Sequence, residues 1–211
     1  GEGTYFYGGV APQSSLYVAR IGDSTGTVNV GLAPQALSDL AAEGVHLVNN
    51  SYGVSVDITD PTSGASLAAN RYSLYSSVVA NNQLMVWAAG NDSFANADVE
   101  AGLPYYYPSL QQNWLAVVNV EVNANGQITG LDPTSNACGV AAQWCLAAPG
   151  NAYVTPVTGT NFSLGAADGT SNSAAVVTGV AALVWQHFPF FTVSNVQETL
   201  LGTATSLGTG T

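Results

Sequence analysis

The chain has 211 residues, of which 47% are hydrophobic and only 7% are charged. This length and apolar content suffice for one compact domain with a sizeable core. Two basic residues against thirteen acidic ones give a formal net charge of −11, which argues against nucleic acid or an anionic membrane as a partner. No apolar run approaches the roughly 18 residues that a membrane span requires, so we expect no membrane insertion.

In the first half of the chain, apolar runs alternate with helical patterns. A short apolar and β-branched run at 16–21 predicts a buried strand. A helix is expected at 34–44, a strand at 45–49, a helix at 67–82 and a strand at 84–89. Strands that alternate with helices predict an α/β fold with a mainly parallel central sheet and helices on both faces. Ligands of such sheets gather beyond the carboxyl ends of the strands.

The second half continues this pattern with longer loops. A fourth strand is predicted at 114–120, a long helix at 171–187 that Pro189 stops, and a last helix at 193–201 capped by Ser194 or Asn195. The stretches at 93–107, 123–136 and 151–168 are predicted as surface loops, with a small antiparallel extension as the alternative. The Thr- and Gly-rich tail at 202–211 is expected to fray.

The two cysteines, Cys138 and Cys145, enclose six residues. A pair this close in a chain so poor in lysine is typical of a disulfide loop from an oxidising compartment. A pair of buried thiols is the alternative, and a metal site is disfavoured because no histidine or further cysteine is near. We therefore predict a disulfide, no metal and no cofactor.

Ser171 stands at the start of the long apolar helix, directly after Gly169 and Thr170. A serine hydroxyl is a poor nucleophile near neutral pH and needs an adjacent base and donors for the oxyanion that it creates. A helix amino terminus supplies unpaired backbone N–H groups and the positive end of the helix dipole. Ser171 is thus a candidate nucleophile, although Gly-Thr-Ser before a helix is more often only a cap.

Two more segments come directly after predicted strands. Ala88, Ala89 and Gly90 end one strand and present Asn91, whose amide could donate to an oxyanion. Ser51, Tyr52 and Gly53 end another, where exposed backbone could pair with an extended peptide. Each segment alone is more commonly a turn.

Taken together, these segments resemble the subtilisin-like serine proteases. The motifs that carry the resemblance follow the order of that family: Gly9-Val-Ala-Pro12, Val48-Asn-Asn-Ser-Tyr-Gly53, Ala88-Ala-Gly-Asn91, Ala147-Ala-Pro-Gly150 and Gly169-Thr-Ser171. Leu103-Pro-Tyr-Tyr-Tyr-Pro108, Trp114-Leu-Ala-Val-Val118 and the segment from Cys138 to Cys145 further resemble the branch carried as passengers of bacterial autotransporters. The resemblance covers nearly all of the chain.

The resemblance implies a role for each of these positions. Ser171 attacks the scissile carbonyl, and Asn91 with the Ser171 backbone N–H stabilises the oxyanion. The segments 51–53 and 88–90 line the primary specificity pocket and hold a peptide or protein substrate as an added strand. The implied location is secreted or at the bacterial cell surface.

Two features depart from the family pattern. The aspartate motif and the His-Gly-Thr-His motif, which precede Gly9 in the family order, are absent. We expect residues 1–211 to be the C-terminal portion of a subtilisin-like peptidase domain, with base and orienting carboxylate supplied by an upstream segment of the same protein. The residues after Ser171 also differ, with Asn172-Ser173 and Ala175-Val176 where the family usually has Met-Ala and Pro-His.

Neither histidine of the chain is expected to serve as the base. His46 precedes Ser51 by five residues, about 16 Å along a strand, and His187 lies about 24 Å along the helix from Ser171. Proton transfer needs about 3 Å. The leading hypothesis is a serine endopeptidase of which this chain holds part of the machinery. The alternative is a non-catalytic secreted module that binds peptide, and another serine hydrolase is disfavoured because no Gly-x-Ser-x-Gly elbow is present.

Overall fold

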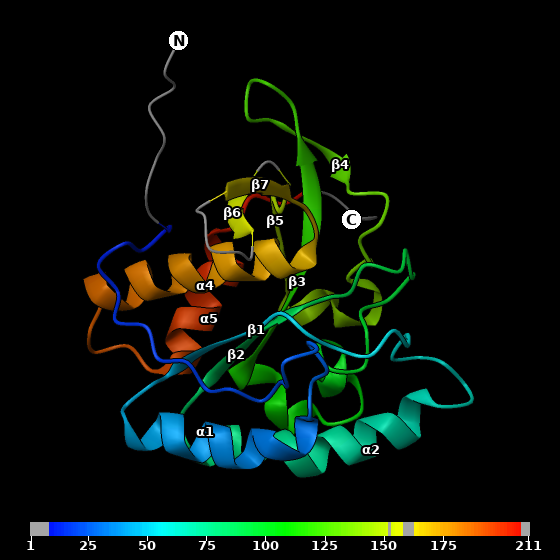
Figure 1. The fold of residues 1–211 in the computed structure, drawn as a ribbon, viewed down its shortest axis with the longest axis vertical. Coiled ribbons are helices and arrows are strands. Elements are labelled where there is room, and N and C mark those ends of the chain that lie inside the picture. Colours follow the sequence, from blue (N-terminus) through cyan, green and yellow to red (C-terminus); the bar gives the residue numbers. More distant parts are fainter. Residues whose placement is uncertain (1–8, 152, 158–162, 208–211) are drawn as a thin grey trace.

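The computed structural model describes residues 9–151, 153–157 and 163–207 (Figure 1). Its central sheet contains four parallel strands in the order β1 (Leu47–Asn50), β2 (Leu84–Ala88), β3 (Trp114–Val122) and β5 (Cys145–Ala148). β4 (Ile128–Leu131) returns antiparallel to the far end of β3, which extends beyond its neighbours. The predicted α/β fold with a mainly parallel sheet is confirmed.

Helices cover both faces of the sheet (Figure 1). One face carries α1 (Ala33–Ala42), α2 (Gly64–Tyr75) and α3 (Ser77–Ala80), and the other carries α4 (Thr170–His187) and α5 (Val193–Thr203). Short 3-10 turns connect these layers at Val30–Leu32, Leu103–Tyr105, Pro108–Asn113 and Gly139–Trp144.

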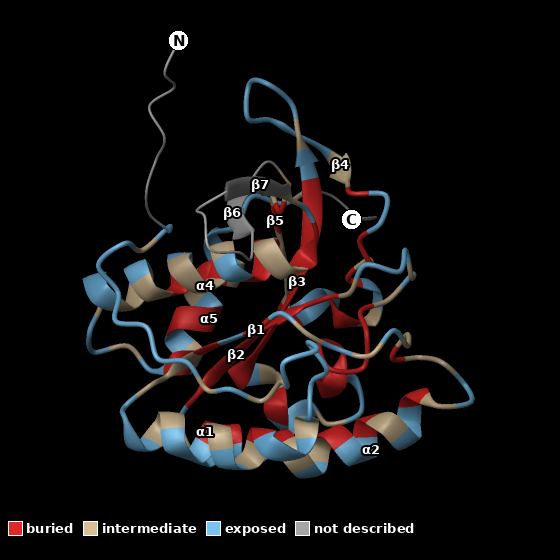
Figure 2. Cartoon of the chain, viewed as in Figure 1, coloured by how far each residue is buried: buried red, intermediate tan, exposed pale blue. Residues whose placement is uncertain are grey.

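The strands separate two apolar cores. Met85 and Trp87 of β2 face the α1–α3 side, while Leu84 and Val86 face α4 and α5. Because successive side chains of a strand point to opposite faces, a sheet covered on both sides needs apolar residues at every position. All five residues of β2 are buried, and Figure 2 shows the sheet buried between exposed outer helix faces.

The predicted buried strand at 16–21 is wrong. Those residues form no strand, and the side chains of Leu16 and Val18 are 90% and 91% exposed. A strand needs a neighbour for its backbone hydrogen bonds. Within the described residues, 16–21 pairs with no strand, and only the following residue, Gly22, forms an isolated bridge, with Val28. β1 is consequently an edge strand of the described sheet.

Other predicted elements differ in detail. The helix expected at 67–82 is divided at Ser76 into α2 and α3. The cap of α5 is Thr192, which exchanges hydrogen bonds with Asn195 in a capping box, and not Ser194 or Asn195 as predicted. β5 was not predicted. At 151–168 the alternative of a small antiparallel extension holds, because β6 (Tyr153–Val157) and β7 (Ser163–Ala167) form an antiparallel hairpin. In the described part of the chain, no helix is long and apolar enough to cross a membrane.

Candidate active site

Three segments that are distant in the sequence meet where the parallel strands end. Asn91, after β2, accepts hydrogen bonds at Oδ1 from the backbone N and the Oγ1 of Thr170, at 2.9 and 3.1 Å. Ser51, after β1, donates from Oγ to the Ser171 carbonyl oxygen at 2.9 Å. The structure thus brings Ser51, Asn91 and Ser171 to one site at the carboxyl edge of the sheet, where α/β proteins bind ligands.

Ser171 is the second residue of α4 and is half-buried. The helix begins after Gly169, whose φ of +121° is one that residues with a side chain rarely adopt. A Cβ on this glycine would lie 3.1 Å from Asn91 Oδ1, so glycine permits the close approach of the two segments. The Ser171 hydroxyl is 3.5 Å from the Ser51 carbonyl oxygen, which is long for a hydrogen bond of this kind.

Asn91 is exposed, and the contacts of its side chain orient it. Because Oδ1 accepts both donors of Thr170, the Nδ2 group faces away from that residue and has no partner among the described residues. Thr170, itself fully buried, also accepts the Gly90 N–H at Oγ1 over 3.3 Å. An oriented amide donor, free of any acceptor in the described part of the chain, therefore stands beside the amino terminus of α4.

Two buried asparagines hold the segments around the site, and neither was predicted from the sequence. Asn136 donates to the Ala89 carbonyl oxygen at 2.8 Å, and its Oδ1 accepts from the backbone of Asp92. Asn119, at the end of β3, accepts the Gly150 N–H at 2.7 Å and donates to Asp168 at 2.9 Å. For Asn119 the sequence does hold a signal, because it is a polar residue inside the apolar run 114–120 and a buried polar group requires hydrogen-bond partners.

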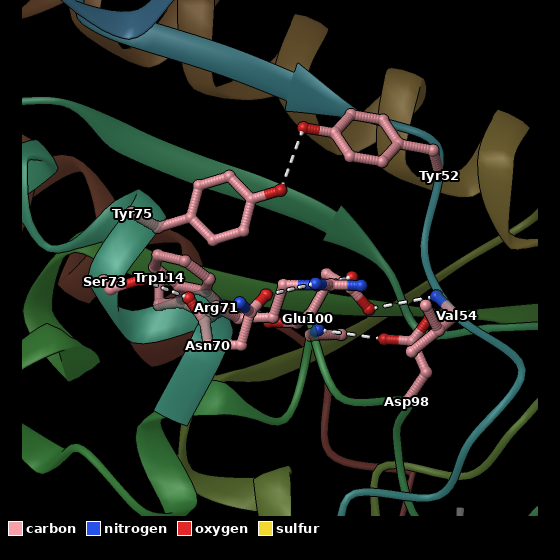
Figure 3. A network of polar contacts seen from close by, with 10 residues as sticks. Tyr52, Val54, Asn70, Arg71, Ser73, Tyr75, Asp98, Glu100 and Trp114 are labelled. Atoms are coloured by element: carbon pink, nitrogen blue, oxygen red, sulfur yellow. Dashed lines mark hydrogen bonds and ion pairs between the residues drawn. The ribbon is translucent and has the colours of Figure 1, made fainter. Parts of the chain in front are cut away.

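The segments 51–53 and 88–90, which the sequence analysis assigned to a specificity pocket, are joined by a third segment at 97–100. Asp98 donates its backbone N–H to the Ala89 carbonyl oxygen at 2.9 Å. Glu100 accepts the Val54 N–H at Oε2 over 3.0 Å and pairs through Oε1 with Arg71 of α2 at 2.5 Å. Figure 3 shows these groups converging from α2, the loop after β1 and the segment that leads to Glu100.

Burial controls the protonation of this region. The pKa of Asp98 is well above its usual range, because the carboxyl is buried and because Glu100 and Asp92 are close. Burial also raises the pKa of Tyr52, whose hydroxyl lies 3.4 Å from that of Tyr75. Arg71 balances the charge of Glu100, whereas Asp98 has no ion pair among the described residues.

The two histidines lie away from the site. His46, before β1, stacks on Trp185 in the last third of α4, with 5.1 Å between ring centroids, and its Nδ1 lies 2.8 Å from the Asn82 carbonyl oxygen. His187 is the last residue of α4, at the opposite end of the helix from Ser171. Neither is in reach of the Ser171 hydroxyl.

Cys138 and Cys145 form the predicted disulfide, which closes the 3-10 turn at Gly139–Trp144. Among the residues that the structure describes, no group of three or more His, Cys, Asp or Glu side chains could hold a metal ion.

The fold and the site define an α/β protein in which the segment that starts α4 is hydrogen-bonded to Asn91 and to Ser51 at the carboxyl edge of a parallel sheet. The sequence model of the subtilase family (Peptidase_S8) matches residues 2–211. The chain belongs to the subtilase family, which is the family of the subtilisin-like serine proteases.

Several bacterial proteins are similar in sequence. The neisserial autotransporter lipoprotein NalP of Neisseria meningitidis is 29% identical over 238 residues, covering 95% of this chain and 22% of NalP. Serotype-specific antigen 1 of Mannheimia haemolytica is 35% identical over 133 residues, with 61% of this chain and 14% of the antigen covered. Subtilisin NAT of Bacillus subtilis subsp. natto is 27% identical over 95% of this chain and 46% of its own length. The chain thus spans less than half of each of these relatives.

Solved structures share the fold. The protease domain of PatA, in its S218A form, matches with a TM-score of 0.70 and 24% identity over 98% of this chain and 70% of the PatA chain. Sphericase matches with a TM-score of 0.63 and 20% identity over 92% of this chain and 61% of its own. These likenesses agree with the layered architecture described above.

Proposed function

We propose that this chain provides the nucleophile, the oxyanion-binding groups and part of the substrate cleft of a serine endopeptidase. The observation that carries the proposal is the convergence of Ser171, Asn91 and Ser51 at the carboxyl edge of the sheet. Membership of the subtilase family supports it.

In the proposed reaction, the Ser171 Oγ attacks the carbonyl carbon of the scissile peptide bond as its proton passes to a base. The negative charge that develops on the carbonyl oxygen is stabilised by Asn91 Nδ2 and the Ser171 backbone N–H. Collapse of this intermediate breaks the C–N bond, the amine leaves with a proton, and water then hydrolyses the acyl-enzyme. An oriented amide donor of this kind contributes about 10²- to 10³-fold to the rate.

The substrate is proposed to lie in an extended conformation along Ser51–Gly53, pairing with exposed backbone as an added strand. Tyr52 packs its ring on Trp87 at 5.3 Å between centroids, and its hydroxyl lies next to that of Tyr75. These contacts hold the segment from the core side. The segments Ser51–Gly53 and Ala88–Gly90 would then form the two walls of the pocket for the side chain that precedes the scissile bond.

The base and its orienting carboxylate are proposed to come from a segment outside residues 1–211, because neither histidine of the chain lies near Ser171. A groove of about 1180 Å³ beside β1 offers a place for this segment. Residues 9–21, α1, β1 and α4 line the groove, and the exposed Leu16 and Val18 belong to its lining. An added strand at the β1 edge would cover this apolar surface.

We also propose that the protein is secreted or displayed at a bacterial cell surface. The disulfide supports an oxidising compartment. Among the relatives, NalP is named an autotransporter lipoprotein, and a Serratia marcescens protein, 30% identical over 149 residues, is named an extracellular serine protease.

The second candidate is a pseudoprotease module that holds peptide without cleaving it. The observation that favours it is that no base lies near Ser171 among the residues that the structure describes, where its hydroxyl makes only a long contact with the Ser51 carbonyl oxygen. Peptide binding without turnover by the full-length natural protein would identify this function.

The test is covalent capture of a fluorophosphonate probe by the full-length natural protein. We expect labelling of the wild type, none of Ser171→Ala, and unchanged labelling of Ser109→Ala, a matched change at an exposed serine outside the site. Equal labelling of wild type and Ser171→Ala would reject Ser171 as the nucleophile. No labelling of the wild type, together with peptide binding, would support the pseudoprotease.

A further inference from the structure

The segment Ala97–Glu100 lies under both proposed walls of the pocket. Its backbone is hydrogen-bonded to the wall 88–90, because the Asp98 N–H donates to the Ala89 carbonyl oxygen. Its Glu100 side chain accepts the N–H of Val54, the residue directly after the wall 51–53. A Cβ on Gly53 would overlap Asp98 Oδ2, and a Cβ on Gly90 would lie 3.6 Å from Asp98 Cβ. The Asp98 side chain is therefore in direct contact with one wall and next to the other.

Gly53 is the wall residue that contacts this carboxyl, and on the other wall Gly90 lies against Asn136 and next to Asp98 Cβ, so neither glycine places a side chain in front of Asp98. Gly53 is exposed on its outer side, whereas Asp98 is only 3% exposed. In Figure 3, Asp98 lies below Val54, on the opposite side of Glu100 from Arg71. In the proposed pocket, the Asp98 carboxyl would therefore lie at the floor between the two walls.

The floor carries a carboxyl that has no ion pair among the described residues. Arg71, one of the two basic residues of the chain, pairs with Glu100, and the other, Arg20, is exposed and bonds the Gly22 carbonyl oxygen. Asp98 itself accepts the Ala101 N–H at 2.9 Å. Asp92 accepts a hydrogen bond from Ser55 and adds a second acidic group close to the walls.

A buried carboxyl of this kind is stabilised in its charged form only by an opposite charge or by hydrogen-bond donors. Its raised pKa reflects burial first and the neighbouring carboxylates second. A substrate guanidinium or ammonium group brings both a positive charge and donors, whereas an apolar group would leave the carboxyl with backbone N–H donors and no opposite charge. An acidic side chain would meet like charge.

We propose that Asp98 determines the primary specificity of the site by selecting substrates with arginine or lysine immediately before the scissile bond. This inference rests on the proposed function, because it uses the same two walls. Charge-assisted hydrogen bonds of this kind correspond to a preference of about 10- to 100-fold over an apolar residue of similar length.

The first experiment uses the wild-type full-length natural protein and a series of internally quenched peptides that differ only at this position. Arginine, lysine, methionine, leucine and glutamate are compared by kcat/KM. We expect arginine and lysine to exceed methionine by about tenfold or more, and glutamate to be the poorest. A profile led by leucine or methionine overturns the proposal.

The second experiment compares Asp98→Asn with a control. The substitution keeps the size of the side chain and removes its charge, so the arginine-to-methionine ratio of kcat/KM should fall to within about threefold of one. The ratio cancels any change in the amount of active protein. The control, Asp39→Asn, removes the same charge from an exposed position on α1 and should leave the ratio unchanged. An unaltered ratio in Asp98→Asn refutes the assignment.

Binding to Ser171→Ala separates this inference from the proposed function. Dissociation constants for arginine and methionine peptides are measured by calorimetry, a readout that needs no turnover. Tighter binding of the arginine peptide without hydrolysis by the wild type supports the specificity and rejects the endopeptidase. Hydrolysis without an arginine preference supports the endopeptidase and rejects the role of Asp98.

Discussion

The Arg71–Glu100 ion pair provides the sharpest prediction about what holds the site together. The Arg71 and Glu100 side chains are 8% and 0% exposed, and Glu100 also binds the Val54 N–H and accepts the Trp114 indole N–H at its backbone oxygen. Arg71→Met retains a side chain of comparable length but removes the guanidinium. Glu100 is then left as a buried charge next to Asp98, with no cation to balance it.

The cost is estimated from burial. Removing one partner of a buried ion pair lowers the free energy of unfolding by about 3–5 kcal/mol, whereas an exposed pair contributes about 0–1 kcal/mol. Both partners here are nearly inaccessible, so the larger figure applies. Because the free energy of unfolding of a domain is about 5–15 kcal/mol, we expect Arg71→Met to remove a large part of the stability of this protein.

The assay is unfolding in guanidinium chloride, followed by tryptophan fluorescence. The control is Arg20→Met, which changes the other basic residue of the chain at an exposed position and should shift stability by less than about 0.5 kcal/mol. The double variant Arg71→Met/Glu100→Gln removes both charges and should recover a good part of the loss. A loss below about 1 kcal/mol in Arg71→Met, or no recovery in the double variant, would refute the reasoning.

Two further predictions concern Asp98 and the disulfide. Because the pKa of Asp98 is raised in the folded state, the protonated carboxyl favours the native state. Its contribution to the free energy of unfolding is fully present below the ordinary pKa of an aspartate and is lost as pH rises through the pKa of the folded state. The free energy of unfolding of Asp98→Asn should therefore rise relative to that of the wild type as pH increases from about 4 to 8, by at most about 1.4 kcal/mol per pH unit. Guanidinium unfolding at a series of pH values measures this difference. A difference that does not change with pH contradicts the prediction. Replacing Cys138 and Cys145 by serine should cost about 2–3 kcal/mol in the same assay under oxidising conditions, because the short closed loop restrains the unfolded chain. Equal stability of the serine variant and wild type would show that the link contributes nothing.

Local patterns were sufficient for much of the fold. The apolar runs that became β2 and β3 and the long helix that became α4 follow from periodicity and length, because a strand buried on both faces requires apolar residues at every position. The same reasoning failed at 16–21. That run has the composition of a buried strand, but burial depends on a neighbouring strand, and none of the described residues provides one.

β5 was missed for the opposite reason. Its four residues, Cys145–Ala148, form too short a run to be distinguished from a loop, and only pairing with Ala116–Asn119 of β3 makes them a strand. The cap of α5 lies two or three residues before the predicted one, because Thr192 and Asn195 are both acceptable caps and the geometry of the chain entering the helix decides between them.

By itself the sequence determined the fold class and the positions of Ser171, Asn91 and Ser51, since each follows or starts an element that periodicity reveals. Only the tertiary structure decided that Arg71, Asp98 and Glu100 lie beneath the segments 51–54 and 88–90. These residues come from a helix and a loop with no shared local pattern. Their meeting results from the packing of α2 and the loop after β2 against the end of the sheet, a long-range outcome that neighbouring residues do not encode.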